Sequence, residues 1–254
     1  MMHLQAIKNK VHMLVNLISI CLSCTIISCR CNNDPLPRNT NTKPALKGNT
    51  TPQSKPTDES YNLRKAELNS LIEMNKQLTL EDIQRARLLI SKLDKPQVKE
   101  KYNDGMNILG YAASNNKPEI VQLLVERIAE VDRTELNIKS NSDKYTPLHQ
   151  ILVNIRTAGI QEEIRALKSI KVAKLLIEKL DVAELAEQDK WGNTPLHYAI
   201  KCDVGLSIQL IQKIASVDKL KLNLENKDKE TPLSLAKQTG DKALEKLLEE
   251  KLAS

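Results

Sequence analysis

Histidine and cysteine are the side chains of this sequence that could act as general bases, nucleophiles or metal ligands. The histidines are His3, His12, His149 and His197. The first two fall in a segment with the composition of an export signal, and the last two each end a Thr-Pro-Leu-His tetrad. No Gly-rich phosphate loop, His-Glu-x-x-His pair or Ser-centred elbow is present. We therefore expect no catalytic residue, no metal site, no cofactor and no enzymatic activity.

The cysteines are concentrated at one end of the chain. Cys21, Cys24, Cys29 and Cys31 all lie in the first 31 residues, and only Cys202 lies in the body. A disulfide framework needs cysteines spread through the fold, so this distribution argues against one. We expect Cys202 to be a small buried hydrophobe and not a nucleophile.

The N-terminal cysteines belong to a segment with the layout of a signal peptide. Residues 1–29 have a basic start, an apolar run over 11–27 and a Ser28-Cys29 end. A permanent membrane span is the alternative, but Asn16 interrupts the apolar run and polar, proline-containing chain follows it. We expect the segment to be cleaved.

The residues Ile26-Ile27-Ser28-Cys29 resemble the bacterial lipobox, in which an aliphatic and a small residue precede a cysteine that is lipidated. This resemblance implies that Cys29 is acylated and becomes the mature N-terminus, anchored to a membrane surface of the cell envelope. Acyl chains on one residue hold a protein on a bilayer when two or more are present. The alternative is an ordinary cleavage site near Cys29 and a secreted protein.

Residues 30–58 read as a spacer. They are rich in Asn, Thr, Pro, Lys and Ser and contain few apolar residues, so they cannot bury enough surface to become ordered. Their prolines stiffen the chain. We expect a disordered tether that holds the folded part away from the membrane.

Composition favours an all-α fold for the remainder. Hydrophobic residues make up 41% of the chain, aromatic residues only 2%, and Phe is absent. Leu, Ile, Val and Ala must then fill the core, which suits close helix packing better than a sheet sandwich.

The charge pattern argues against nucleic-acid binding. The formal net charge is +6, of which Lys8 and Lys10 in the predicted signal contribute two. Acidic and basic residues alternate along the chain, whereas nucleic-acid binders cluster Lys and Arg with aromatic residues. We expect no nucleic-acid partner.

The body of the chain repeats. Thr-Pro-Leu-His stands at 146–149 and at 194–197, Thr-Pro-Leu-Ser stands at 231–234, and a weaker copy, Asn-Ile-Leu-Gly, stands at 107–110. A second apolar pattern follows 16 residues later in three of the copies, counted to Leu123, Leu210 and Leu247. In the copy at 146 it follows after 29 residues, which indicates an insertion of about 13 that we place within 154–169.

Each copy predicts a pair of short helices. Proline is tolerated in the first helical turn and threonine is a good N-cap, so each tetrad should begin a helix. The second pattern has amphipathic helical spacing. Such short helices cannot bury their apolar faces alone and must stack on their neighbours. The motif residues are Thr146, Pro147, His149, Thr194, Pro195, His197, Thr231 and Pro232.

These motifs resemble the ankyrin repeat, whose signature runs Asp-x-x-Gly-x-Thr-Pro-Leu-His-x-Ala and later Val-x-x-Leu-Leu, close to the sequence from Asp189 to Ile211. The resemblance covers residues 102–254. It implies an ankyrin-repeat solenoid that binds another protein and in which His149 and His197 hydrogen-bond between neighbouring repeats.

The predicted organisation follows from these observations. Residues 59–101, with helices expected at 63–76 and 80–93 and Thr79 capping the second, form an N-terminal cap or degenerate repeat. The segments are a signal peptide (1–29), a linker (30–58), the cap (59–101), and four repeats at 102–140, 141–188 with the insertion, 189–225 and 226–254 as the C-terminal cap.

The sequence departs from the family pattern between the repeats. It has only seven Gly, and the connecting segments, such as 131–143 and 182–189, are long and rich in Leu, Asn and Glu. We expect these segments to carry an extra helical turn instead of the tight, finger-like hairpin of the family.

The family's pattern also places a candidate concave binding surface. Trp191, the only Trp, falls in the loop before the third tetrad, at a position that faces partners in ankyrin repeats, and Trp is enriched at interface hot spots. Local packing on its own turn is the alternative. By the same carry-over the surface comprises Asp104, Met106, Tyr145, Trp191, Asn193, Lys201 and Glu230.

Together these features predict a monomeric, membrane-tethered bacterial module that binds a protein partner. Proteins of a eukaryotic host are candidate partners by analogy alone. A secreted, non-lipidated effector whose stack targets it to a partner is the alternative. An enzyme that uses the insertion at 154–169 is a third, less favoured hypothesis.

Overall fold

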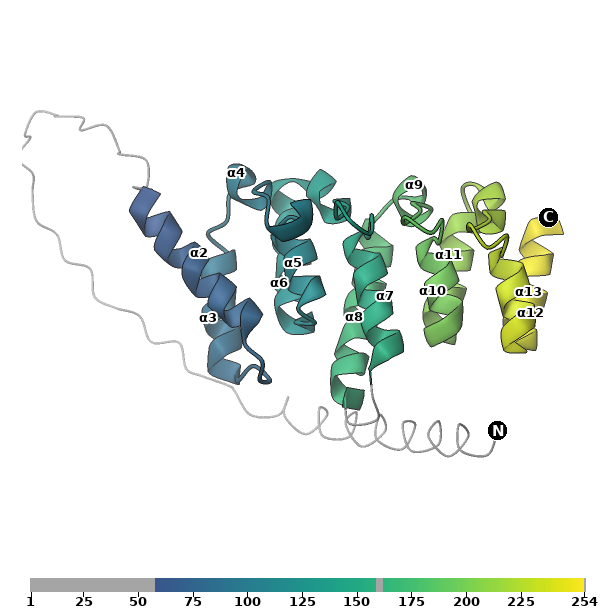
Figure 1. Cartoon of the computed structure of the whole chain (residues 1–254), viewed down its shortest axis with the longest axis horizontal. Coiled ribbons are helices and arrows are strands. Elements are labelled where there is room, and N and C mark those ends of the chain that lie inside the picture. Colours follow the sequence, from purple (N-terminus) through teal and green to yellow (C-terminus); the bar gives the residue numbers. More distant parts are fainter. Residues whose placement is uncertain (1–57, 159–161, 254) are drawn as a thin grey trace, which may run out of the picture. The chain divides into compact units, whose positions relative to one another are not determined.

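The computed structural model describes residues 58–158 and 162–253, and within them every regular element is a helix (Figure 1). This confirms the all-α prediction. The predicted signal peptide, the lipidation position Cys29 and the linker up to residue 57 lie outside the described residues. Among the residues described, no helix is both long and apolar enough to cross a bilayer.

Ten helices form five consecutive pairs. These are α2 (Asp58–Glu73) with α3 (Leu80–Ile90), α5 (Ile108–Ser114) with α6 (Pro118–Val131), α7 (Pro147–Thr157) with α8 (Glu163–Lys179), α10 (Pro195–Cys202) with α11 (Val204–Ala215), and α12 (Pro232–Thr239) with α13 (Lys242–Ala253). Short helices connect them: α4 (Lys95–Val98), η1 (Asn103–Gly105), η2 (Arg133–Asn137), α9 (Val182–Leu185) and η4 (Lys219–Asn223).

The pairs stack in register, as an ankyrin-repeat solenoid requires. The first helices form one row, in which α5 packs on α7, α7 on α10 and α10 on α12. The second helices form a parallel row from α3 through α6, α8 and α11 to α13. Leucine, isoleucine, valine and alanine fill the layer between the rows, with Leu124, Leu152, Leu176 and Leu210 fully buried. Each layer therefore buries the apolar face of the next.

The predicted caps begin the first helices. Thr231 Oγ1 accepts the Ser234 N–H at 3.1 Å, and Thr146 Oγ1 accepts the His149 N–H at 3.3 Å. In the weak copy Asn107 takes the threonine's place and accepts from Gly110. Each cap is followed by a residue suited to the first turn, and at α7, α10 and α12 that residue is proline.

The first pair differs from the predicted ranges. The helix expected at 63–76 runs instead from Asp58 to Glu73, and the one expected to end at residue 93 ends at Ile90. Thr79 caps α3 as predicted, accepting from the Asp82 N–H at 3.2 Å. The apolar pattern continues past α3 because Leu93 is buried in the turn that leads into α4.

The insertion lengthens one pair. Helix α7 has 11 residues and α8 has 17, against 8 and 12 in α10 and α11. In Figure 1 the lower end of α8 extends beyond the neighbouring pairs. Residues 159–161, between the two helices, are outside the described part.

The connecting segments carry both a helical turn and a tight turn. The helical turns η2, α9 and η4 confirm the first half of the prediction, but the expected loss of the tight turn is wrong. Each segment closes into a turn, here called a finger, through one bond from its first N–H to its last carbonyl. Fingers 1 to 4 span 102–106, 140–145, 189–193 and 226–230, with closing distances of 2.7, 2.9, 2.9 and 2.9 Å.

Residues with positive φ let the fingers turn back, and in fingers 3 and 4 the side chain of the first residue also caps the turn. Asp189 Oδ1 accepts the N–H groups of Trp191 and Asn193, and Asn226 Oδ1 plays the same part in finger 4. Gly192 adopts φ 82° and Lys229 φ 64°. A backbone bond joins each pair of adjacent fingers, such as that from the Lys227 N–H to the Trp191 carbonyl at 2.9 Å.

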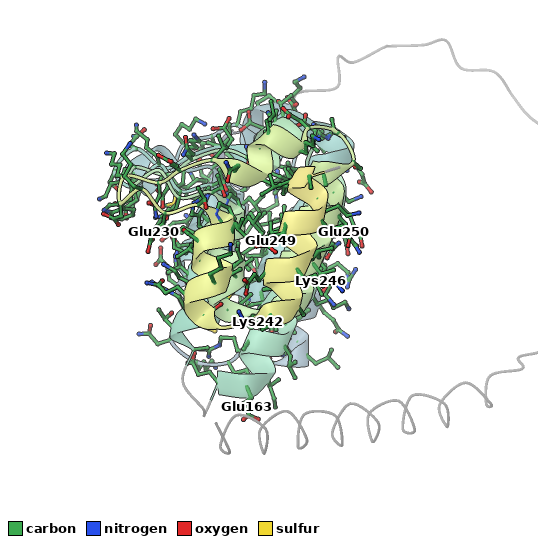
Figure 2. All side chains as sticks on the ribbon, turned by 90° about the vertical axis from the view of Figure 1, so that its right-hand side faces the viewer. Glu163, Glu230, Lys242, Lys246, Glu249 and Glu250 are labelled. Carbon is green, nitrogen blue, oxygen red and sulfur yellow. The ribbon has the colours of Figure 1, made fainter. Side chains whose placement is uncertain are left out.

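The last pair presents a charged outer side. Lys242, Lys246, Glu249 and Glu250 project from α13 where the stack is seen end-on (Figure 2), and Glu249 pairs with Lys237 of α12 at 2.9 Å. A polar outer face on the terminal pair is what solubility requires of a solenoid end.

Candidate functional site

The two tetrad histidines bridge neighbouring repeats, as predicted. His149 Nδ1 lies 3.3 Å from the Thr146 amide nitrogen, and Nε2 lies 3.1 Å from the carbonyl oxygen of Asn193 in finger 3. His197 repeats the arrangement, with Nε2 3.2 Å from the Glu230 carbonyl of finger 4. Because Nδ1 accepts from a backbone N–H, the proton belongs on Nε2, which donates to the carbonyl.

Burial keeps both histidines neutral. It lowers the pKa of His149 to about 4, and it lowers the pKa of His197 below its ordinary value as well. A buried, neutral imidazole whose two nitrogens both have backbone partners has no free position for a substrate proton. These histidines therefore position the fingers against the helices.

Within the described residues, the other features that could carry chemistry would be a cluster of possible metal ligands and the thiol of Cys202. In the described part of the chain, no three of His, Cys, Asp and Glu converge on a possible metal position. Cys202 is half-buried, and burial raises the pKa of its thiol to about 12, so it stays protonated and unreactive at neutral pH.

A hollow of about 230 Å³ lies between α7, finger 3 and α10, and we call it the Trp191 hollow. Its lining residues are Tyr145, Arg156, Trp191, Asn193, His197, Tyr198 and Lys201. Four of them, Tyr145, Trp191, Asn193 and Lys201, belong to the surface predicted from the sequence, so the fold brings these four side chains together.

Aromatic rings form the floor and one wall of this hollow. The ring centroids of Tyr145 and Trp191 lie 5.7 Å apart, and Tyr145 meets Tyr198 edge to face at 6.1 Å. Tyr198 is 7% exposed, whereas Trp191 is 41% exposed. Trp191 thus packs locally on Tyr145 and also presents much of its ring to solvent.

Buried Asp189 holds the cluster in place. Its Oδ1 accepts the backbone N–H groups of Trp191 and Asn193 at 2.8 and 2.9 Å, and its Oδ2 accepts the Tyr198 hydroxyl at 2.6 Å. The hydroxyl of Tyr145 lies a further 3.3 Å from that of Tyr198. Burial and the bond to Asp189 raise the pKa of Tyr198, so the hydroxyl stays neutral. One carboxylate therefore fixes the finger and the aromatic floor together.

Cationic groups surround the aromatic cluster. Lys190 Nζ lies 4.3 Å from the centroid of the Trp191 ring, and Arg156 Cζ lies 5.9 Å from that of Tyr198. Lys201 Nζ lies 3.8 Å from the carboxylate of Glu230. The two cation–π contacts, of Lys190 with Trp191 and of Arg156 with Tyr198, each stabilise the fold by about 0.5–1 kcal/mol if they are exposed.

Three of the residues predicted for the binding surface lie elsewhere. Asp104 bridges fingers 1 and 2, accepting from Ser142 Oγ at 2.6 Å and from its N–H at 2.8 Å; these bonds lower the pKa of Asp104. Met106 is half-buried beside Gly110. Glu230 does not line the Trp191 hollow but contacts two residues that do, Lys201 through its carboxylate and His197 through its carbonyl.

Two lining residues were missed by the sequence reasoning. Tyr198 directly follows the histidine of the third tetrad, a position that varies within the motif. Arg156 stands seven residues after His149, two helical turns along α7, and this spacing places both on one face. That spacing was the available signal, but the register of α7 against α10 was needed to use it.

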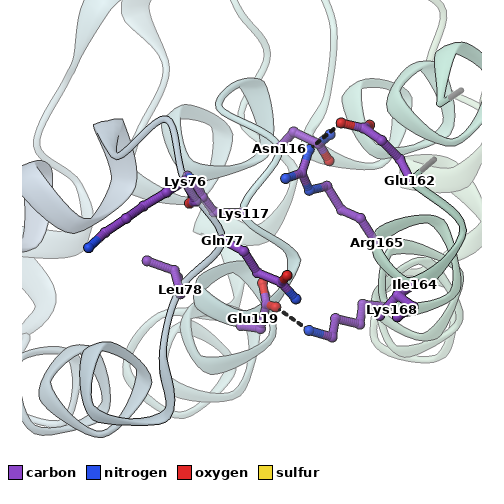
Figure 3. Close-up of a pocket in the computed structure, with 10 residues that line it drawn as sticks. All are labelled: Lys76, Gln77, Leu78, Asn116, Lys117, Glu119, Glu162, Ile164, Arg165 and Lys168. Atoms are coloured by element: carbon purple, nitrogen blue, oxygen red, sulfur yellow. Dashed lines mark hydrogen bonds and ion pairs between the residues drawn. The ribbon is translucent and has the colours of Figure 1, made fainter.

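A second hollow, of about 290 Å³, lies between the α2–α3 turn, the α5–α6 turn and the start of α8 (Figure 3). Two of its cations form ion pairs, Lys168 with Glu119 and Arg165 with Glu162, each at 2.6 Å. Lys117, mostly buried here, donates to backbone carbonyls, and burial lowers its pKa. Because none of its described lining residues is aromatic, the larger hollow is the weaker candidate for a protein interface.

Comparison with known proteins agrees with the repeat architecture. The ankyrin repeat family model matches residues 104–133, which include α5 and α6. The matched copy is the one whose tetrad is weakest, Asn-Ile-Leu-Gly, so the similarity extends beyond the Thr-Pro-Leu-His motif. A search of curated proteins found no match.

Proposed function

We propose that this chain is a protein-interaction module that binds a partner through the Trp191 hollow and the fingers beside it. The observation that carries the proposal is a large, exposed indole ring mounted on a hydrogen-bonded aromatic cluster. Tryptophan, tyrosine and arginine are the residues in which interfaces concentrate their energy, and all three line this hollow.

The rigidity of the cluster supports a binding role. Trp191 and Asn193 are held by Asp189, and the finger is tied to α7 by His149. A surface ordered before binding loses little conformational entropy when a partner arrives. The volume of about 230 Å³ lies below the range of about 300–1,000 Å³ typical of small-molecule sites, so the hollow suits side chains of a protein.

A pair of matched substitutions tests this function. With a partner captured by the full mature chain, Trp191→Ala should weaken binding about thirtyfold or more, because hot-spot truncations cost about 2 kcal/mol or more. Leu220→Ala is the control, since Leu220 is 75% exposed in η4 and lines neither hollow. Equal affinities for the wild-type chain and Trp191→Ala would exclude the hollow as the binding surface.

We also propose that the module is displayed on a membrane of the cell envelope by acylation of Cys29. The support is the lipobox-like sequence, and the spacer of residues 30–58 would give the stack reach. Mass spectrometry of the mature N-terminus should find acylated Cys29, and Cys29→Ser should abolish it. A mature chain with a free N-terminus and no acyl group would favour the secreted form. Host proteins as partners are a further proposal that rests on analogy.

A further inference from the structure

We infer that the Trp191 hollow selects a protein segment that presents a carboxylate side chain next to an apolar one. This inference rests on the proposed function and adds the chemistry of the partner. It follows from three features of the hollow: the cations around it, the bonds that its neighbouring acids already form within the protein, and the exposed indole ring.

Two cations are available to a ligand. Arg156 is exposed at the end of α7, and no ion pair joins it to an acid of the described residues; its guanidinium lies over the ring of Tyr198. Within the part of the chain that the structure describes, the acid partner of Lys201 is Glu230, at a long 3.8 Å. The planar guanidinium of Arg156 suits two-pronged binding of a carboxylate, and Lys201 can add a point charge.

The acids nearby are already occupied. Asp189 is 6% exposed, and its two carboxylate oxygens accept hydrogen bonds from Trp191, Asn193 and Tyr198. Asp143 pairs with Lys190. Glu230 accepts from the side-chain amide of Asn226 at 3.0 Å. Among the described residues, an incoming anion therefore meets Arg156, which has no acid partner, and competes with Glu230 alone for Lys201.

The same arrangement disfavours a cationic ligand. An aromatic cluster alone would suit a methylated or free ammonium group. Here Lys190 lies over the Trp191 ring and Arg156 over the Tyr198 ring, so the ring faces already have cations beside them. A third cation would be repelled, and the exposed part of Trp191 is left for an apolar neighbour of the bound carboxylate.

A selection experiment followed by a binding measurement tests this inference. Random peptides displayed on phage are selected on the full mature chain, and Asp or Glu beside Leu, Ile, Phe or Trp should be enriched. One selected acidic peptide is then compared with its Asn or Gln twin by fluorescence anisotropy. The acidic peptide should bind about tenfold more tightly, and this advantage should shrink as salt is raised from 50 to 500 mM.

Arginine 156 should account for much of the preference. Arg156→Gln should remove most of the acidic peptide's advantage and leave the affinity of the amide twin unchanged, and Arg156→Lys should restore part of it. Lys246→Gln, an equal loss of charge on exposed α13, should leave the preference intact. Arg156 is exposed, so the melting temperature of the variant should match that of the wild-type chain.

The outcomes separate the two proposals. Selected peptides that need Trp191 but carry no acid, or carry Lys and Arg, would overturn the carboxylate inference and leave the proposed function standing. Peptides whose binding is unaffected by Trp191→Ala, or a selection that yields none, would contradict the proposed function itself.

Discussion

At the residue scale, the two histidines show how a side chain with catalytic potential becomes structural. Each stands three residues after a capping threonine, so its Nδ1 faces the start of its own helix while Nε2 reaches the next finger. Protonating Nδ1 would destroy its acceptor role, and protonation in a buried place is costly in any case. Its hydrogen bonds and its burial therefore both keep the imidazole neutral.

This neutrality predicts a pH-dependent stability. The unfolded imidazole has a pKa near 6.5, and burial lowers that of folded His149 to about 4. Between these values the unfolded state binds a proton that the folded state does not, so stability is complete above pH 6.5 and falls as the pH falls. We expect a loss of about 2 kcal/mol between pH 7 and pH 5 in urea unfolding.

The control for this prediction is His149→Gln, which should remove the share of the slope that His149 contributes and leave the share of His197, whose pKa burial also lowers. Carboxylates titrate mostly below pH 5, so they add little to the slope there. In the wild-type chain, the His149 ring should titrate by NMR well below 6.5. A midpoint at or above 6.5 would show that the ring is not buried neutral.

Sequence reasoning succeeded for these histidines because the tetrad fixes their surroundings. The threonine of each tetrad caps the helix, and the histidine contacts the finger of the next repeat. It failed for Arg156 because a lone arginine in the last turn of a helix is ordinarily a solvated charge. Only the packing of α7 on α10, which places Arg156 near Tyr198, gives it a part in the hollow.

At the scale of elements, the fingers are the feature that the sequence described incompletely. The connecting segments are long, and length alone suggested a helical turn in place of a tight one. A helical turn and a tight turn both fit into one connecting segment. The helical turns η2, α9 and η4 occupy its first residues, and a finger of five or six residues occupies its last. Asp189 and Asn226 carried the missing signal, since each is an acceptor at the first position of a turn.

Glycine substitutions test the finger geometry. Gly192 has φ 82°, and a Cβ there would lie 3.0 Å from Asn226 Cα and 3.1 Å from the Lys227 nitrogen in finger 4. Gly240, after α12, has φ 74° with nothing within 4 Å. Gly240→Ala should cost only the left-handed penalty of about 1–2 kcal/mol. Gly192→Ala should cost clearly more, measured as free energy of unfolding.

The comparison of Gly192→Ala with Gly240→Ala can also contradict the finger geometry. Equal costs for the two alanine variants would mean that fingers 3 and 4 are not in close contact. In that case Trp191 would not be held where the structure places it, and the shape of the Trp191 hollow would have to be revised.

The insertion is the second element-scale feature, and the sequence located it within 154–169. Its effect was not readable, because 13 extra residues could have formed a loop. The structure lengthens α7 and α8 instead, and the first turns of α8 supply Ile164, Arg165 and Lys168 to the second hollow. The extra turns of α7 likewise carry Arg156 to the edge of the Trp191 hollow.

At the scale of the whole folded unit, repetition made the architecture predictable. Four copies of one pattern, three of them at the same distance from a second pattern, leave stacked helix pairs as the arrangement that buries every apolar face. Placement of the binding surface was less predictable, because it depends on how adjacent layers meet. Tyr145, Trp191, Asn193 and Lys201 converge, whereas Asp104 and Met106 serve the fingers and helices around them.

The central claim is that a partner binds where the fingers meet the first helices, at the Trp191 hollow. Hydrogen exchange of backbone amides, read by mass spectrometry with and without a bound partner, tests it most directly. We predict that exchange slows in fingers 3 and 4 and at the exposed end of α7. Slowing confined to α8, α11 or the second hollow, with 189–193 unchanged, would contradict the account.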